Sequence, residues 1–147
     1  MAGWWHGRRH AFLTQSVESI ANELSGKAAG EGLKVEQAQY TEWIESIKLL
    51  QSSLASENMK IIDGLILEYD FKRRGLRMDV ILLVGIHAIV IEFKRSKLTA
   101  SDSEQVVNYC VNLCEFHKVT QLNIKEGAYV IPILVSRENK QKLSHNW

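Results

Sequence analysis

The stretch RMDVILLVGIHAIVIEFKRSK, residues 77–97, determines which fold the sequence predicts. It contains two apolar runs rich in valine and isoleucine, residues 78–84 and 87–95, a composition typical of β-strands. Gly85 lies between the two runs and predicts a tight hairpin turn. We therefore expect two neighbouring antiparallel strands in this part of the chain.

Charged residues interrupt both predicted strands. Asp79 lies near the beginning of the first strand, and Glu92 and Lys94 lie inside the second. Because successive side chains of a strand point to opposite faces, Glu92 and Lys94 should share one face of the sheet. By the same rule, Asp79 should share its face with Arg77 and Ile81. The hairpin would place Asp79 opposite the segment that contains Glu92, so that the two carboxylates approach each other.

Two carboxylates at close range repel each other unless a cation lies between them. Hard oxygen ligands suit Mg²⁺ or Mn²⁺, which keep several waters and accept phosphate oxygens as further ligands. A metal held in this way polarises a phosphodiester and generates hydroxide from a bound water. Lys94 would orient that water or stabilise the charge that develops on phosphorus. The alternative is an ordinary Glu–Lys pair at a solvated sheet edge.

Helices are predicted before and after this pair of strands. Residues 10–25 and residues 35–54 carry apolar side chains at helical spacing. Further along, Ser101-Asp102-Ser103-Glu104 matches a capping box, which predicts a helix that ends near His117. Trp4 and Trp5 either anchor the first helix to the core or stack on nucleic-acid bases.

Two further strands complete the expected fold. Residues 61–71 form the first, in which Gly64 is interpreted as a bulge, and residues 127–136 form a continuous apolar strand covered on both faces. Pro132 indicates an irregularity or a sheet edge, because proline has no N–H to donate. The resulting α/β fold is a three-layer sandwich with a central mixed four-stranded sheet.

The length of 147 residues fits a single domain. We expect an N-terminal helix and loop over residues 1–34, a core over residues 35–137 and a tail over residues 138–147. No apolar run approaches the ~20 residues of a membrane helix, and the N-terminus lacks the apolar segment of a signal peptide. These features predict a cytoplasmic protein that does not bind membranes.

The net charge of +1 means that any nucleic-acid binding must depend on local basic clusters. Two such clusters flank the carboxylates: Lys72, Arg73, Arg74 and Arg77 before Asp79, and Lys94, Arg95 and Lys97 after Glu92. The alternative is that both clusters are ordinary solvated strand ends. Cys110 and Cys114 are interpreted as small core residues, because a metal site needs more ligands than this pair supplies.

Asp79, followed across the hairpin by Glu92-Phe93-Lys94, resembles the signature of the PD-(D/E)XK nuclease superfamily. Gln105 and the tyrosine four residues later form Gln-x-x-x-Tyr, similar to the motif that follows the triad in the RecB-like branch. More narrowly, LILEYDFKRRGLRMDVILL, VIEFKRSK and VIPILVS resemble a bacterial nuclease-like domain that precedes a superfamily-1-type helicase. This resemblance covers roughly residues 37–136.

The resemblance implies a restriction-endonuclease-like αβββαβ core, preceded here by an extra N-terminal helix. It makes Asp79 and Glu92 metal ligands together with the Phe93 backbone carbonyl, and it makes Lys94 the catalytic lysine. A further upstream acid would complete the metal site, either Glu68 on the first strand of the core or Glu45 on the long helix. Met78 stands where the superfamily name places a proline.

The same resemblance gives Gln105 and Tyr109 a role in holding the active site or the DNA backbone. The alternative for these two residues is a helix face that packs on the sheet. The cations expected to neutralise DNA phosphates are Arg73, Arg74, Arg77, Arg95 and Lys97.

The sequence therefore predicts a Mg²⁺- or Mn²⁺-dependent deoxyribonuclease that acts in restriction, repair or defence against foreign DNA. The alternative is a catalytically silent nuclease-like module that binds nucleic acid or a partner protein such as a helicase. The expected partners are DNA, a helicase domain or subunit, and a second copy of the chain. A nearly neutral net charge fits a module that gains part of its DNA affinity from such a partner.

Overall fold

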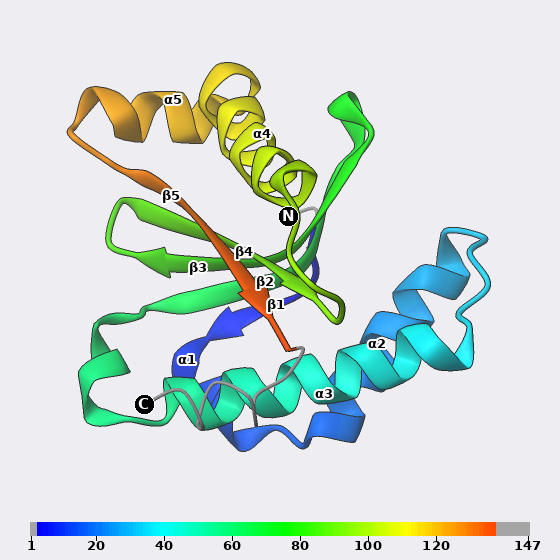
Figure 1. The fold of residues 1–147 in the computed structure, drawn as a ribbon. Helices are drawn as coiled ribbons and strands as arrows, with labels where there is room; N and C mark the ends of the chain where they lie inside the picture. Colours follow the sequence, from blue (N-terminus) through cyan, green and yellow to red (C-terminus); the bar gives the residue numbers. More distant parts are fainter. Residues whose placement is uncertain (1–2, 138–147) are drawn as a thin grey trace.

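The stretch at residues 77–97 forms β3 (Leu76–Val84) and β4 (His87–Lys94), an antiparallel pair joined by a tight turn (Figure 1). Val84 pairs with His87, so the turn consists of Gly85 and Ile86 alone. Gly85 has a φ of 58°, a left-handed conformation that glycine adopts more readily than other residues. The predicted hairpin is confirmed.

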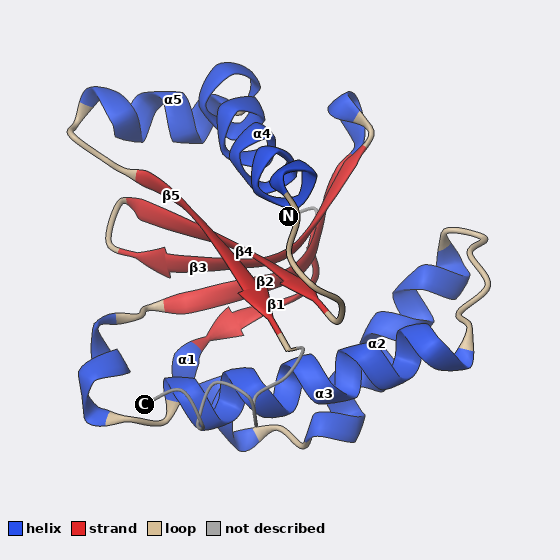
Figure 2. Ribbon diagram, in the orientation of Figure 1, coloured by secondary structure: helices blue, strands red, loops and turns tan. Residues whose placement is uncertain are grey.

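The computed structural model describes residues 3–137, with the exception of the side chain of Arg73. The predicted tail over residues 138–147 lies outside the described residues. The remaining elements, shown in Figures 1 and 2, are β1 (Gly3–Arg8), α1 (Arg9–Thr14), α2 (Val17–Gly30), α3 (Gln37–Leu54), the 3₁₀ turns η1 (Glu57–Ile61) and η2 (Lys72–Arg74), β2 (Gly64–Phe71), α4 (Ala100–Phe116), α5 (Lys118–Lys125) and β5 (Val130–Ser136).

The strands form one mixed sheet in the order β1-β2-β3-β4-β5. The pairs β1–β2, β2–β3 and β3–β4 are antiparallel, and β5 runs parallel to β4. The mixed α/β class is confirmed, whereas the prediction of four strands is wrong because the described part of the chain adds β1 at one edge.

Two tryptophans explain why the N-terminus forms a strand. Trp4 and Trp5 are both 7% exposed. Trp4 packs edge-on against Trp43 of α3 with 6.4 Å between ring centroids, and Trp5 packs against Phe12 of α1 at 5.5 Å. Burial of such rings contributes roughly 2–3 kcal/mol each. The prediction that these tryptophans anchor the first helix to the core is confirmed.

Gly64 is a point of close backbone approach and not the predicted bulge. It pairs with Arg8 on one side and Leu83 on the other, and both ladders continue from it with a constant register. A Cβ atom at this position would lie 2.6 Å from the carbonyl oxygen of Gly7. The absence of a side chain therefore allows β1 to pair with β2.

We expect Gly64→Ala to destabilise the protein by about 1–3 kcal/mol, because the added methyl group meets backbone that cannot move independently. Gly26→Ala is the matched control, since a Cβ there meets no atom within 4 Å and alanine favours the helix. The two free energies of unfolding are compared in urea. Equal effects of the two substitutions would contradict this account of Gly64.

The predicted helix over residues 10–25 is two helices, α1 and α2. Ser16 separates them, and its Oγ accepts the N–H of Ser19 at 3.1 Å as the N-cap of α2. A serine side chain competes with helix continuation by bonding local backbone, which explains the break. At its other end α2 extends through residues predicted to be a loop, where Ala28 is 2% exposed and packs in the core.

The helix after β4 begins two residues earlier than its predicted capping box. Thr99 is the N-cap of α4, and Asp102 is the acidic partner at the third helical position. The predicted pair of Ser101 and Glu104 is therefore wrong, because Thr99 and Asp102 have the same spacing at the place where the chain leaves β4. The prediction also lacked α5, which His117 caps by accepting the N–H of Thr120.

The helices belong to two groups. α1, α2 and α3 contribute to one cluster of buried side chains, which includes Phe12, Leu24 and Ile47, and α4 contributes to a second cluster with Val106 and Leu113. In Figure 1 the sheet lies between α3 and α4. The predicted catalytic residues lie in β3 and β4 of this sheet, Asp79 near the beginning of β3 and Glu92 and Lys94 near the end of β4.

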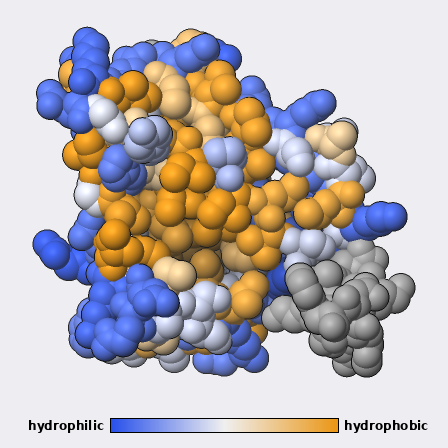
Figure 3. All heavy atoms as spheres, turned by 60° about the vertical axis from the view of Figure 1, so that its left-hand side comes forward, coloured by the Kyte–Doolittle hydropathy of each residue, from blue (hydrophilic) through white to orange (hydrophobic). Residues whose placement is uncertain are grey.

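β5 is an edge strand, as Pro132 indicated. The prediction that it is covered on both faces is wrong, because Ile131 and Ile133 are 42% and 40% exposed. Tyr129 and Val119 of α5 are exposed as well. Apolar side chains gather on the surface that carries α5 and the beginning of β5 (Figure 3).

Candidate active site

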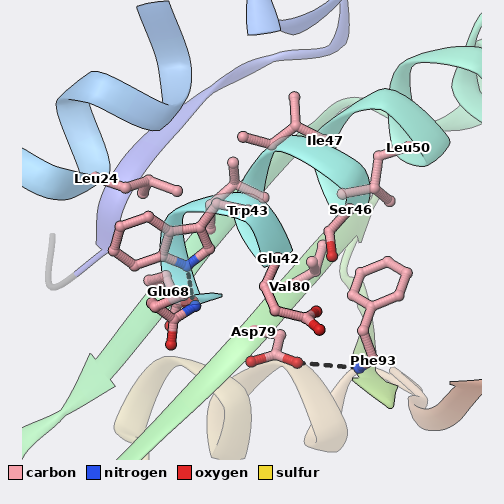
Figure 4. A pocket seen from close by; sticks show the side chains of 12 residues that line it. Leu24, Glu42, Trp43, Ser46, Ile47, Leu50, Glu68, Asp79, Val80 and Phe93 are labelled. Atoms are coloured by element: carbon pink, nitrogen blue, oxygen red, sulfur yellow. Dashed lines mark hydrogen bonds between the residues drawn. The ribbon is translucent and has the colours of Figure 1, made fainter. Parts of the chain in front are cut away.

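The side chains of Asp79 and Glu92 replace the backbone ladder where β3 and β4 separate. The ladder between the two strands ends at the pair Val80–Ile91. Beyond this pair, Glu92 Oε1 accepts the N–H of Asp79 at 3.0 Å. In the other direction, Asp79 Oδ2 accepts the N–H of Phe93 at 3.0 Å, the bond drawn between these two residues in Figure 4. Each carboxyl group is thus fixed by one oxygen, and the predicted approach of the two groups is confirmed.

The alternation of side chains reverses at Asp79. Val80 packs in the cluster of α3, whereas Met78, two residues earlier, packs in the cluster of α4. Arg77 lies over the ring of Trp4 on the α3 side. The expectation that Asp79 shares a face with both Arg77 and Ile81 is therefore wrong for Ile81, which belongs to the cluster of α4.

On the neighbouring strand β2, the alternation of side chains reverses beside Asp79 as well. Leu67 packs in the cluster of α3 and Tyr69 in that of α4, although they are also two residues apart. Between them Glu68 has a φ of 49°, a left-handed conformation that costs a non-glycine residue roughly 1–3 kcal/mol. Such local strain is typical of functional sites, where the surrounding packing maintains it.

The strained backbone directs the Glu68 side chain toward α3. Glu68 Oε1 accepts the indole N–H of Trp43 at 2.7 Å, and Oε2 lies 3.1 Å from Nε of Arg77. The side chain is 8% exposed. Burial, followed by the nearby charge of Asp79, raises the pKa of Glu68 to about 7.

The three acidic side chains influence one another. Burial raises the pKa of Asp79 above its ordinary value. Burial, followed by the charge of Asp79, raises the pKa of Glu92 to about 9. The carboxyl groups of Asp79 and Glu92 are close enough to share a proton. The site thus concentrates potential negative charge that a bound cation would stabilise.

The acidic side chains of this region supply only part of the ligand set of a metal ion. Within residues 3–137, no three His, Cys, Asp or Glu side chains converge as a metal-binding group. Glu68 is engaged with Trp43 and Arg77, and Glu45 pairs with Arg137 at 2.8 Å. Neither residue therefore completes a three-carboxylate site in this arrangement. Two carboxylates and a peptide carbonyl still suit Mg²⁺, which is commonly bound by one or two carboxylates and several waters.

Lys94 points toward α4. Its Nζ lies 3.0 Å from Oδ1 of Asp102, and its side chain is 40% exposed. On the next turn of α4, Gln105 Nε2 donates to the hydroxyl of Tyr109 at 2.7 Å. Tyr109 is buried in the cluster of α4, and its pKa is raised by burial and then by the charge of Glu92. The Gln-x-x-x-Tyr pair thus packs on the sheet and also lies near the carboxylates.

Most cations predicted to neutralise phosphates have partners within the protein. Arg77 pairs with Glu68, and Arg95 lies 2.9 Å from Glu42. The others are Arg74, bonded to Asn112 and stacked on Phe116; Lys97, exposed in the loop after β4; and Arg73, whose side chain lies outside the described residues. Lys72, a member of the same basic cluster, pairs with Glu31. Phosphate binding at the paired positions would exchange one ionic interaction for another.

Arg137 is a residue of this region that the sequence analysis missed. Its side chain is 10% exposed and pairs with Glu42 and Glu45 of α3. Its charge also lowers the pKa of Asp79, against the larger effect of burial. The sequence signal for this ion pair was the spacing of Glu42 and Glu45. Residues three apart lie on the same face of a helix, and two glutamates on a covered face need a cationic partner.

We expect Arg137→Ala to destabilise the protein by about 2–3 kcal/mol, because it leaves Glu42 without one of its partners in a largely buried position. Lys125→Ala on α5 is the control, since single surface charges contribute little. Chemical denaturation measures the free energy of unfolding of both variants. An Arg137→Ala effect below about 0.5 kcal/mol would contradict a structural role of this ion-pair network.

A cavity of about 210 Å³ adjoins Glu68 and Asp79 between α3 and the sheet (Figure 4). Its lining combines aliphatic side chains with the polar groups of Ser46, Glu68 and Asp79. It is smaller than the roughly 300–1,000 Å³ of typical small-molecule sites. The cavity is therefore small for the enclosure of a typical small-molecule ligand.

Comparison of the chain with protein-family models, with curated proteins and with solved structures gave no match. The resemblance to the PD-(D/E)XK superfamily therefore stays a prediction. Across residues 3–137, no helix combines the length and the apolar character required to cross a membrane.

Proposed function

We propose that this protein is a Mg²⁺- or Mn²⁺-dependent deoxyribonuclease that hydrolyses phosphodiester bonds in restriction, repair or defence against foreign DNA. The observation that carries the proposal is the pair of Asp79 and Glu92, whose carboxyl groups are fixed side by side where β3 and β4 separate. Lys94 ends the same strand as Glu92. The proposed fold is correspondingly the restriction-endonuclease-like core, with β1 added to its sheet.

Asp79, Glu92 and the Phe93 carbonyl would hold the metal. When bound, the ion supplies a nucleophilic hydroxide at neutral pH and polarises the phosphoryl oxygen. Each carboxyl group accepts one backbone N–H, and the two groups also contact each other, so a bound ion would replace their mutual contact. Because their pKa values are raised, these groups must lose a proton to act as ligands, so metal binding should strengthen as the pH rises.

Lys94 would stabilise the negative charge that develops on the phosphoryl group or orient the attacking water. Tyr109, hydrogen-bonded to Gln105, would support the Glu92 side of the site. Arg74, Arg77, Arg95 and Lys97, together with Arg73, would contact the DNA backbone. Because these contacts are ionic, DNA binding should weaken as the salt concentration increases.

A second candidate is a catalytically silent module that binds DNA or a partner protein such as a helicase. The exposed apolar surface on α5 and β5 favours it, because large exposed apolar patches often mark protein interfaces (Figure 3). A second copy of the chain is another proposed occupant of that surface. This candidate differs from the first in one respect that can be measured, namely that it cuts no DNA.

The test is a cleavage assay on end-labelled single-stranded and double-stranded DNA with Mg²⁺, with Mn²⁺ and with a chelator. The proposal predicts cleavage that requires the metal and disappears when Asp79→Ala replaces the wild-type protein. Cleavage that persists in the chelator, or no cleavage with either metal on either substrate, would contradict it. In the second case, DNA binding without cleavage would support the silent module.

A further inference from the structure

The N-terminus of α4 holds the ammonium group of Lys94. Lys94 Nζ lies 3.0 Å from Oδ1 of Asp102, and this carboxylate belongs to a residue that is only 7% exposed. The ion pair joins the end of β4 to the first turn of α4, across the loop of residues 95–99. The partner of Lys94 is therefore a buried carboxylate in the first turn of a helix.

The two oxygens of Asp102 have separate tasks. Oδ2 accepts the backbone N–H of Thr99 at 2.9 Å and the hydroxyl of Thr99 at 3.1 Å, which closes the capping box of α4. Oδ1 faces Lys94. These hydrogen bonds and the charge of Lys94 lower the pKa of Asp102, so the group is a carboxylate at neutral pH. The bond from the Thr99 backbone N–H, which does not depend on the Thr99 side chain, fixes the orientation in which Asp102 meets the ammonium group.

Lys94 needs such a partner because of its position. It is the last residue of β4, and its half-exposed side chain has four flexible methylene groups. A flexible ammonium group loses catalytic effect when its position relative to the reacting phosphate is not fixed. No other carboxylate within the described residues forms a salt bridge with Lys94.

We propose that Asp102 is a positioning residue that holds Lys94 for phosphodiester hydrolysis. The inference rests on the proposed function, because it gives Asp102 a role only through Lys94. Asp102 does not contact the substrate. It couples the cap of α4 to the chemistry at the end of β4.

Asp102→Asn and Thr99→Ala separate this role from helix capping. Asparagine keeps an oxygen that can accept the N–H of Thr99 but presents no negative charge to Lys94. Thr99→Ala removes the capping hydroxyl and leaves the Asp102 carboxylate in place. We expect Asp102→Asn to lower kcat about tenfold with little change in KM for DNA, and Thr99→Ala to change kcat less than about twofold, at a temperature where both variants are folded.

Two further variants complete the cleavage experiment. Asp102→Glu should recover part of the lost kcat, because it restores the charge. In a Lys94→Ala background, Asp102→Asn should cause no additional loss, because the group that it positions is absent. Equal losses for Asp102→Asn and Thr99→Ala, an unchanged or increased kcat in Asp102→Asn, or full additivity with Lys94→Ala would overturn the proposal.

A second measurement does not depend on activity. The rate at which an amine-acetylating reagent modifies Lys94, followed by peptide mass spectrometry, should increase several-fold in Asp102→Asn and stay unchanged in Thr99→Ala. Equal labelling of all three proteins would overturn the ion pair itself. If the wild-type protein cuts no DNA but the labelling result is as expected, the proposed function and the catalytic role of Asp102 fail while the ion pair stands.

Discussion

Lys94→Ala is expected to lower the rate of Mg²⁺-dependent DNA cleavage by about 10²–10³-fold, the usual cost of removing a group that stabilises transition-state charge. Lys94 is not among the groups proposed to hold the metal. The affinity for Mn²⁺ should therefore change little. Single-turnover cleavage under saturating metal measures the rate, and calorimetry measures the affinity.

Lys97→Ala is the matched control for this prediction. Lys97 carries the same charge, lies three residues further along the chain and is exposed in the loop after β4. It should change the affinity for DNA, and its dependence on salt, more than the cleavage rate at saturation. Equal effects of the two alanine substitutions on the saturated rate would mean that Lys94 acts only as a general DNA contact.

The second large effect is a loss of stability with rising pH. The pKa of Glu68 rises from 4.5 to about 7 on folding. This shift makes the free energy of unfolding about 3 kcal/mol larger when Glu68 is protonated than when it is ionised. Because the folded-state value is the higher one, this stabilisation is complete below the unfolded pKa near 4.5 and is lost as the pH rises through about 7. Glu92, raised to about 9, extends the loss to higher pH. The metal-free protein should therefore unfold more easily at pH 9 than at pH 5.

Asp79→Asn tests the origin of this pH dependence. Asparagine can still accept the N–H of Phe93, but it removes a negative charge that raises the pKa of both Glu68 and Glu92. The variant should be more stable than the wild-type protein at pH 8–9 in the absence of metal, and it should be inactive. Glu104→Gln, at an exposed position of α4, is the control. A stability profile that Asp79→Asn leaves unchanged would contradict the electrostatic account of the site.

Local sequence patterns predicted the elements that depend on local contacts. The β3–β4 hairpin was predictable because Gly85 and the two flanking apolar runs act over a few residues. β1 was not predictable in the same way. Its side chains show no polar–apolar alternation, and its partner β2 is about sixty residues away, so only the tertiary packing of Trp4 and Trp5 makes it a strand.

The candidate site also combines features that the sequence predicts with features that depend on tertiary packing. The approach of Asp79 and Glu92 followed from the hairpin register, which strand geometry fixes. The reversal of side chains at Glu68 and Asp79 was not predictable, because Glu68 adopts a left-handed conformation that only tertiary packing maintains and Asp79 leaves the ladder on the strand beside it. The pairing of Lys94 with Asp102 likewise depends on where α4 begins, which the sequence pattern placed two residues too late.

The central claim is that Asp79 and Glu92 form a divalent metal site, and calorimetric titration with Mn²⁺ tests it most directly. The wild-type protein should bind Mn²⁺ at one site or two adjacent sites, more tightly at pH 8 than at pH 6 because both carboxyl groups have raised pKa values. Asp79→Asn should abolish this binding, and Lys94→Ala should retain it. No binding by the wild-type protein at pH 8, or equal binding by Asp79→Asn, would contradict the metal site and the nuclease function proposed from it.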